Sequence, residues 1–135
     1  MKLKVLCYQD MDFSMIGMAK NLQEKHNCDL FNIIDLSGKP QKFFKEQSIV
    51  KYLKKWSYYD HIFPNKKPDL EYLRSIEKNY KLDIWKIAYN DRIFFKYNDF
   101  YKFHPDEILS IIEQGCKLFE SILDEIKPDF VLLPL

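Results

Sequence analysis

Residues 87–103, IAYNDRIFFKYNDFYKF, combine aromatic rings with charged and amide side chains and contain neither glycine nor proline. Aromatic rings stack on flat faces of sugars and nucleobases, and a guanidinium group binds oxyanions through paired hydrogen bonds. On a helix that begins near residue 83, Trp85, Tyr89 and Arg92 share one face. The alternative is that the rings pack between helices while the arginine pairs with a neighbouring aspartate. The candidate substrate-binding residues of this segment are Tyr89, Asp91, Arg92, Tyr97 and Asn98.

A second candidate group follows the first predicted strand. Asp10 and Asp12 lie in the polar segment QDMDFS (9–14), and open α/β sheets bind ligands just beyond the carboxyl ends of their strands. Because carboxylates can accept protons there, Asp10 is the candidate catalytic residue and Asp12 a candidate substrate-binding residue. Asp12 and Ser14 also have the residue types that cap helices, so capping is the structural alternative for these two.

The three histidines do not have the spacing of a metal site. His61 follows Asp60 in YYDHIF and is a candidate substrate-binding residue, because a neighbouring carboxylate can orient an imidazole. His26 and His104 fall at predicted helix ends. The three cysteines have no CxxC spacing, as expected of reduced thiols in the cytoplasm. No metal site and no cofactor are therefore expected in this chain.

Composition excludes several classes of protein. The chain has 135 residues, 47% of them apolar, which is enough for the core of one domain. It carries 21 basic and 20 acidic side chains, interspersed, so nucleic acid is not expected as a partner. No run approaches the ~18 apolar residues of an integral membrane segment. With only three glycines, the phosphate-binding loops GxGxxG and GxxxxGKS/T are absent.

Apolar runs predict the first elements. A strand over 3–8, a helix over about 14–26 and a strand over 28–35 form one βαβ unit, which implies a parallel sheet with a right-handed crossover. The composition of residues 36–40 indicates a turn. The next predicted elements are an amphipathic helix over about 46–56, a third strand over 57–63 and a loop over 64–69.

The remainder of the chain is mostly helical by its pattern. Helices are predicted over about 69–80, 83–97 and 105–126, followed by a buried strand over 130–135. The predicted fold class is α/β: a Rossmann-like three-layer domain with a mostly parallel sheet of about four strands and helices on both faces. Because a loop and a covering helix normally follow such a last strand, residues 1–135 are expected to be a single domain, the N-terminal half of a longer two-domain protein. A complete small domain is the alternative.

Two segments carry a resemblance to a known family. WKIAYNDRIFFKYNDFYKF (85–103) and HPDEILSIIEQGCKLFESILDEIKPDFVLL (104–133) resemble the N-terminal region of prokaryotic capsule and surface-polysaccharide biosynthesis proteins. In that family a short segment with an acidic residue, an arginine and a tyrosine precedes a long helix and a PDxVL strand. The similarity spans about residues 80–133, and the first βαβ unit is compatible with it.

The resemblance implies a GT-B-like glycosyltransferase, in which two Rossmann-like domains enclose the active site. This chain would be the acceptor-side domain, inactive when isolated, and would bind a carbohydrate or lipid-linked glycan acceptor. A nucleotide sugar would be the donor, held by a C-terminal domain that is absent here. The expected location is the cytoplasm or the inner face of the membrane. The family pattern falls on Asp91, Arg92, Tyr97 and Asn98.

Two other hypotheses stay open. The first is a flavodoxin-like interaction module without enzymatic activity, which would form homodimers or dock to a partner through an apolar patch on helix 108–126 or on the last strand. The second is the first domain of a nucleotide-sugar epimerase-like enzyme, against which the missing glycine-rich loop counts. The glycosyltransferase hypothesis also expects Asp10 and the Arg92 face to border one concave surface.

Overall fold

The structure is a computed structural model that describes residues 2–63, 66–95 and 100–134. It consists of two compact units. Unit 1 contains Met1–His61 and Glu120–Leu135, and unit 2 contains Ile62–Phe119. That the whole chain forms a single domain stays a prediction.

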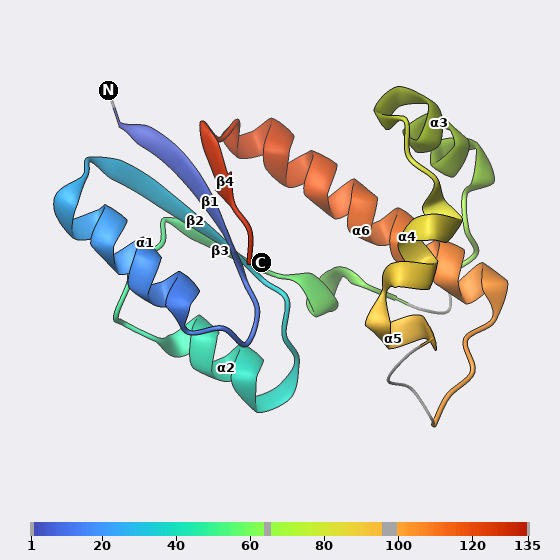
Figure 1. Cartoon of the computed structure of the whole chain (residues 1–135), viewed down its shortest axis with the longest axis horizontal. Coiled ribbons are helices and arrows are strands. Elements are labelled where there is room, and N and C mark those ends of the chain that lie inside the picture. Colours follow the sequence, from blue (N-terminus) through green and yellow to red (C-terminus); the bar gives the residue numbers. More distant parts are fainter. Residues whose placement is uncertain (1, 64–65, 96–99, 135) are drawn as a thin grey trace. The chain divides into compact units, whose positions relative to one another are not determined.

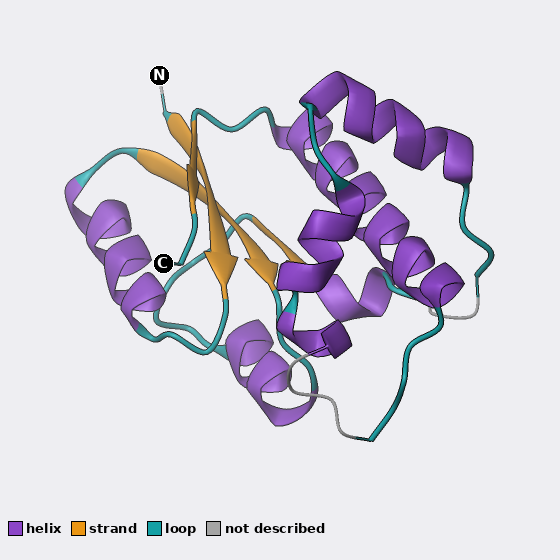
Figure 2. Ribbon diagram, turned by 45° about the vertical axis from the view of Figure 1, so that its right-hand side comes forward, coloured by secondary structure: helices purple, strands orange, loops and turns teal. Residues whose placement is uncertain are grey.

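Unit 1 is built on a four-stranded parallel sheet (Figures 1 and 2). The strands β1 (Leu3–Gln9), β2 (Cys28–Ile34), β3 (Lys54–Ser57) and β4 (Phe130–Leu132) lie in the order β3-β2-β1-β4. β1 pairs with β2 over its whole length, from Leu3 opposite Cys28 to Gln9 opposite Ile34. The βαβ prediction and the α/β fold class are therefore confirmed.

One face of the sheet packs against α1 (Ser14–Lys25) and α2 (Gly38–Glu46) (Figure 1). Side chains alternate between the two faces along a strand, so every second residue of β1 and β2 enters this core. The same core contains Ile16 and Ala19 of α1 and Phe44 of α2. Its strand residues are Val5, Cys7, Leu30 and Ile34.

The opposite face carries the alternate residues. Phe31 and Trp56 are buried there with ring centroids 6.5 Å apart. The C-terminal turns of α6 (Pro105–Ile126) lie on this side of the sheet in Figure 1 and bury Ile122 and Ile126. An ion pair of 2.5 Å between Lys54 and Glu125 joins the end of α6 to β3. The prediction of helices on both faces is confirmed.

Residues 36–63 differ from the prediction. α2 begins at Gly38, inside the predicted turn, with Pro40 in its first turn, where proline is favourable. β3 occupies the end of the predicted helix 46–56, and the predicted strand 57–63 is a turn of 3-10 helix, η1 (Tyr58–His61). The cause is tertiary. Pairing with β2 and burial of Trp56 override the local helical preference of this lysine-rich segment.

Unit 2 is helical. It contains α3 (Leu70–Tyr80), α4 (Ile84–Asn90), α5 (Arg92–Phe95) and the N-terminal part of α6. Asp69 caps α3 by accepting a hydrogen bond from the Tyr72 backbone N–H at 3.1 Å. Asp83 caps α4 by accepting one from the Lys86 N–H, also at 3.1 Å. Such caps satisfy donors that a helix leaves unpaired at its start.

The predicted helix 83–97 is broken. Asp91 has an extended backbone (φ −75°, ψ 123°) and separates α4 from α5. The break allows Phe94 of α5 to join Ala88 of α4 and Ile108 of α6 in one buried cluster. A continuous straight helix would place residues 88 and 94 on different sides, so packing explains the interruption.

Polar side chains of α6 hold the segment that precedes α3. Gln114 bonds to both backbone groups of Phe63: its Oε1 accepts from the N–H at 2.7 Å, and its Nε2 donates to the carbonyl at 2.9 Å. Glu113, whose side chain is 2% exposed, accepts hydrogen bonds from the Asp69 N–H and from Lys117 Nζ, the latter at 2.7 Å. Unit 2 therefore depends on buried polar contacts as well as on its apolar cluster.

Glu113→Ala is expected to destabilise the protein by about 2–3 kcal/mol, because it leaves the part-buried Asp69 N–H and the Lys117 ammonium group without their charged acceptor. Urea unfolding followed by circular dichroism measures this change in the free energy of unfolding. The control is Glu24→Ala, which removes an exposed pair with Lys20 and is expected to cost less than about 0.5 kcal/mol. Equal effects of the two substitutions would contradict the assignment.

Candidate functional site

The carboxyl ends of β1, β2 and β3 bring together tyrosine and aspartate side chains. Tyr8 Oη donates a 2.6 Å hydrogen bond to Asp35 Oδ2. Tyr58 and Tyr59 follow β3 directly, and their rings meet edge to face at 5.2 Å. All four side chains are half-buried. We call these residues, Tyr8, Asp35, Tyr58 and Tyr59, the edge cluster.

Strand pairing positions the edge cluster. Gln9, the last residue of β1, lies opposite Ile34 of β2, and the Asp35 N–H donates to the Gln9 carbonyl at 2.9 Å. Alternation then puts Tyr8 and Asp35 on the same face, because each is one residue away from that inward-facing pair. The hydrogen bond between Tyr8 and Asp35 is thus a direct consequence of the parallel register.

The Tyr8 phenol is held in its protonated form. Burial raises its pKa well above the ordinary value, and the hydrogen bond to Asp35 raises it further because the phenolate would face a carboxylate. The neighbouring Tyr58 and Tyr59 act in the same direction. Tyr8 is therefore a fixed hydrogen-bond donor at neutral pH, and Asp35 is an acceptor at the same edge.

In the turn between β1 and α1, the aspartate carboxylates accept hydrogen bonds from backbone N–H groups of the same turn. Asp10 Oδ1 accepts a hydrogen bond from the Asp12 N–H at 2.8 Å, and Asp12 Oδ1 accepts one from the Ser14 N–H at 2.9 Å. The buried Gln9 donates through Nε2 to the carbonyls of Asp10, at 2.7 Å, and Asp12, at 3.0 Å. The bond from Ser14 lowers the pKa of Asp12. The capping alternative for Asp12 and Ser14 is wrong, because Phe13 is the N-cap residue of α1 and no side chain caps it. The Asp12 carboxylate instead bonds to the Ser14 N–H at the first residue of the helix.

Asp10 is half-exposed at the same edge as the edge cluster. It directly follows Gln9, as Asp35 directly follows Ile34 on the neighbouring strand. The structure therefore brings the candidate catalytic residue next to the strand end that carries Asp35. His61 lies exposed at the end of η1. The carboxylate of the neighbouring Asp60 bonds to Lys45 at 2.9 Å and to Gln41 at 3.3 Å.

Unit 2 carries an exposed row of aromatic rings, formed by Trp85, Tyr89 and Phe95. The Trp85 and Tyr89 rings lie 6.3 Å apart, and the Tyr89 and Phe95 rings stack at 5.1 Å with 28° between their planes. Trp85 is 37%, Tyr89 64% and Phe95 49% exposed. On the same helix Ile84 and Ala88 are buried, whereas Ile87 is 43% exposed.

The other predicted residues of unit 2 are placed as follows. Asp91 is half-buried between α4 and α5 and donates its N–H to the carbonyls of Ile87 and Ala88. Arg92 begins α5, and its side chain lies outside the description. Tyr97 and Asn98 fall outside the described residues. The predicted concave surface shared by Asp10 and the Arg92 face joins the two units and stays a prediction.

The edge cluster was not predicted from the sequence. Tyr8 and Asp35 fall inside the predicted strands 3–8 and 28–35. A signal was present: a polar residue that ends an apolar strand of a parallel sheet lies at the edge where ligands bind. Tyr58 and Tyr59 were assigned to a strand that the structure replaces with η1.

The part of the chain that the structure describes holds no group of three or more His, Cys, Asp or Glu side chains arranged for a metal ion. Among the same residues, no helix has the length and apolar character needed to cross a membrane. Comparisons with protein-family models, with curated proteins and with solved structures found no match.

Asp35→Asn is expected to lower the pKa of Tyr8, because the phenolate would then face a neutral amide. Burial remains, so the pKa stays above its ordinary value of about 10. The pH titration of ¹³C-labelled tyrosine by NMR measures it. From about pH 10 the unfolded chain releases this proton while the folded chain still holds it, so stability falls as the pH rises from there towards the folded pKa. The variant, whose folded pKa is lower, is expected to lose less stability in alkali than the wild type.

The matched control is Asp29→Asn, at the opposite end of the same strand, where Asp29 pairs with Lys2 at 3.6 Å. It is expected to leave the titration of Tyr8 unchanged. A Tyr8 pKa that moves equally in both variants, or in neither, would show that the hydrogen bond to Asp35 is not what holds the phenol protonated.

Proposed function

We propose that this chain is a carbohydrate-binding α/β domain that takes its ligand at the carboxyl edge of the sheet. In this proposal it is the acceptor-side domain of a GT-B-like glycosyltransferase in capsule or surface polysaccharide biosynthesis. The observation that carries the proposal is the Tyr8–Asp35 pair, a phenol and a carboxylate that a 2.6 Å hydrogen bond fixes side by side. The resemblance of residues 80–133 to that family supports the enzymatic context.

The chemistry of the edge cluster suits sugar hydroxyls. A carboxylate accepts hydrogen bonds from hydroxyl groups, and phenols both donate and accept them. Asp35 follows β2, the place where nucleotide-binding sheets of this topology carry an acidic residue for a ribose hydroxyl. Tyr58 and Tyr59 add half-buried rings that can contact the apolar face of a sugar.

Asp10 is the proposed base of this site. In glycosyl transfer the oxygen of an acceptor hydroxyl forms a bond to the anomeric carbon of the donor sugar, and the bond from that carbon to the nucleoside diphosphate breaks. The hydroxyl proton must pass to a base, and Asp10 is half-exposed beside the strand end that carries Asp35. The donor and its binding domain are implied by the resemblance.

The aromatic row of unit 2 supports the same ligand class independently. Its rings are displayed beside the polar side chains of Lys86 and Asn90, which are exposed on the same helix. Aromatic rings with neighbouring hydrogen-bonding groups are typical of carbohydrate contacts. The candidate residues Tyr89, Asp91, Arg92, Tyr97 and Asn98 therefore remain proposed substrate contacts.

NMR titration of the ¹⁵N-labelled protein with glucose, galactose, rhamnose and N-acetylglucosamine tests this proposal. At least one sugar is expected to shift the amide signals of Asp10, Asp35 and Tyr58. Asp35→Asn is expected to weaken that sugar about tenfold, because a hydrogen bond to a charged group is lost. Asp29→Asn should bind normally. If all four sugars leave these signals unmoved at millimolar concentrations, the proposal is wrong.

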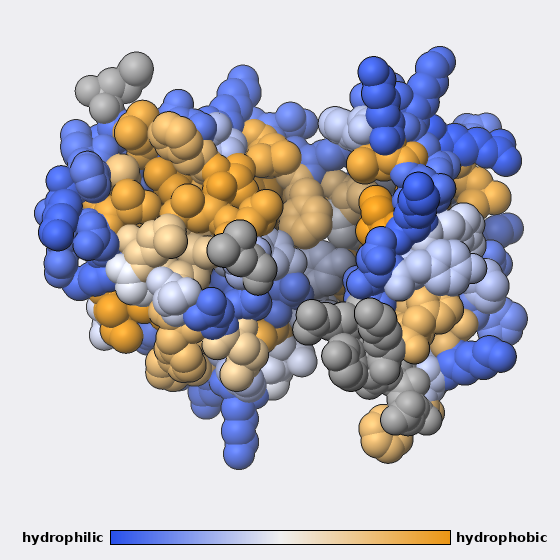
Figure 3. Space-filling view, in the orientation of Figure 1, coloured by the Kyte–Doolittle hydropathy of each residue, from blue (hydrophilic) through white to orange (hydrophobic). Residues whose placement is uncertain are grey.

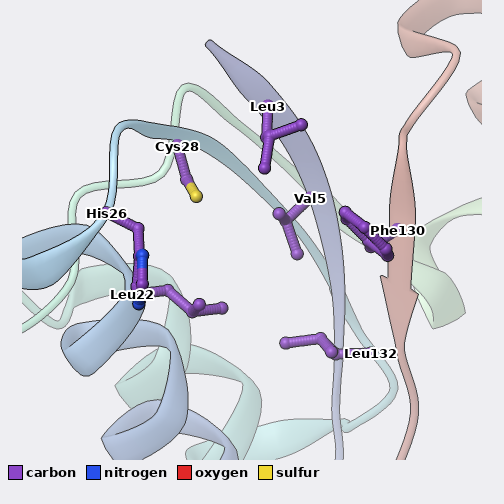
Figure 4. Close-up of a pocket in the computed structure, with 7 residues that line it drawn as sticks. All are labelled: Leu3, Val5, Leu22, His26, Cys28, Phe130 and Leu132. Atoms are coloured by element: carbon purple, nitrogen blue, oxygen red, sulfur yellow. The ribbon is translucent and has the colours of Figure 1, made fainter.

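A specific observation favours the interaction-module alternative. β4 lies at the edge of the sheet, and Phe130, Val131 and Leu133 are exposed around it. Figure 3 shows apolar surface gathered over β1 and β4. A hollow of about 190 Å³ lies between α1 and these strands, and Figure 4 shows its apolar side chains facing one another. Its lining residues are Leu3, Val5, Leu22, His26, Cys28, Phe130 and Leu132.

If this surface binds a second copy of the chain, light scattering after gel filtration will give the mass of a dimer. Phe130→Ser is then expected to yield a monomer, because it removes the largest exposed apolar group at the edge strand. The control is Leu53→Ser, which changes an exposed residue beside the opposite edge strand. A wild-type chain that is monomeric at high micromolar concentration excludes the self-association alternative.

A further inference from the structure

We infer that Asp10 and Asp12 determine specificity: they close the β1–α1 turn to phosphate, so that the edge cluster takes an unphosphorylated sugar. The inference rests on the proposed function and deepens it by naming the ligand class. It is carried by the hydrogen bonds of the turn, which lie within unit 1.

Many parallel-sheet domains use this turn for the opposite purpose. Backbone N–H groups at the start of the first helix point at a phosphate, and small residues allow the anion to approach them. A phosphate site therefore needs donors that the protein itself leaves unoccupied, and it needs a turn without bulky side chains.

Here three donors of the turn are bonded to the protein's own oxygens. The Asp12 N–H donates to the Asp10 carboxylate at 2.8 Å, and the Ser14 N–H donates to the Asp12 carboxylate at 2.9 Å. The next N–H, of Met15, donates to the Asp12 carbonyl at 3.4 Å. Two carboxylates thus take the positions at which an anionic ligand would be bound.

The position of the turn is fixed from beneath by Gln9. This side chain is buried at the end of β1 and donates to two carbonyls of the turn. The turn contains no glycine, and Met11 and Phe13 expose large side chains there. Phe13 also packs against the Phe44 ring at 5.5 Å, which joins the turn to α2. Rearrangement to admit a phosphate would break these contacts.

The negative charges around the turn also disfavour binding of a phosphate. A phosphate at the start of α1 would meet the two carboxylates of Asp10 and Asp12 within the turn, with Asp35 on the neighbouring strand end. Lys45, which an ion pair of 2.9 Å places beside the end of η1, is engaged by Asp60. A neutral sugar lacks this repulsion and can donate hydroxyl hydrogen bonds to Asp35.

Ligands with and without a phosphate group are therefore expected to bind differently at this edge of the sheet. An acceptor sugar with free hydroxyl groups fits the edge cluster, whereas a nucleotide sugar or a sugar phosphate loses the helix-start contact that such ligands use in other sheets of this kind. Asp10 and Asp12 are then specificity-determining residues for an acceptor, whatever sugar it contains.

Inorganic pyrophosphate is the probe, followed by the amide signals of residues 10–17 at constant ionic strength. The wild-type chain is expected to show no saturable shift. Asp10→Asn combined with Asp12→Asn is expected to bind pyrophosphate at least about tenfold more tightly, because the repulsion of two nearby charges is removed. Asp29→Asn, which removes one charge at the opposite end of β2, is expected to behave as wild type.

Asp12→Ser keeps one oxygen that can accept from the Ser14 N–H, on a shorter side chain, and removes the carboxylate charge, so it tests the inference if the double variant does not fold. It too is expected to gain pyrophosphate binding. A wild-type chain that binds pyrophosphate as tightly as these variants overturns the inference, as does a variant that folds and gains nothing.

The two proposals fail differently. If a neutral sugar binds but its phosphate ester binds the wild-type chain equally well or better, the inference is wrong and the proposed function stands. If no sugar binds and Asp12→Ser still gains pyrophosphate, the carbohydrate proposal is wrong, while closure of the turn to phosphate is supported.

Discussion

The parallel pairing of β1 with β2 is the constraint on which the rest of unit 1 depends. It runs over seven residue pairs, from Leu3 opposite Cys28 to Gln9 opposite Ile34. Because the strands run in the same direction and end at the same level, the residues that follow them meet at one edge. Displacing the register by one residue would move Tyr8 and Asp35 to different faces. The 2.6 Å hydrogen bond between them would then be impossible.

The same alternation separates structural from exposed polar groups. Gln9 points toward the core beneath α1 and holds the turn, whereas Tyr8, one residue earlier, is half-buried on the other face beside Asp35. Desolvation and the nearby carboxylate both keep Tyr8 protonated. Two adjacent residues of β1 therefore have different roles. The buried Gln9 holds the turn, and the half-buried Tyr8 belongs to the edge cluster.

The sequence predicted the elements whose pattern has one interpretation. β1, α1, β2 and α6 carry uninterrupted apolar runs or a long helical stripe, and all four were predicted close to their observed bounds. Residues 46–63 were mispredicted because their aromatic and lysine residues fit both a helix and a strand, and only pairing with β2 decides between them. The break at Asp91 likewise depends on the packing of Phe94 with Ile108, which local sequence does not contain.

The candidate site was harder to predict than the fold for a related reason. Asp10 and Asp12 stood out because they lie in a polar turn, yet the turn needs both of them: without a glycine, it satisfies its own N–H groups with carboxylates. Tyr8 and Asp35 are not among the predicted site residues, because they lie at the ends of apolar strands. Asp10 has one carboxylate oxygen bonded to the turn, whereas the Tyr8–Asp35 pair is fixed across two strand ends and is half-buried. We therefore centre the proposed site on the strand ends, with Asp10 beside them.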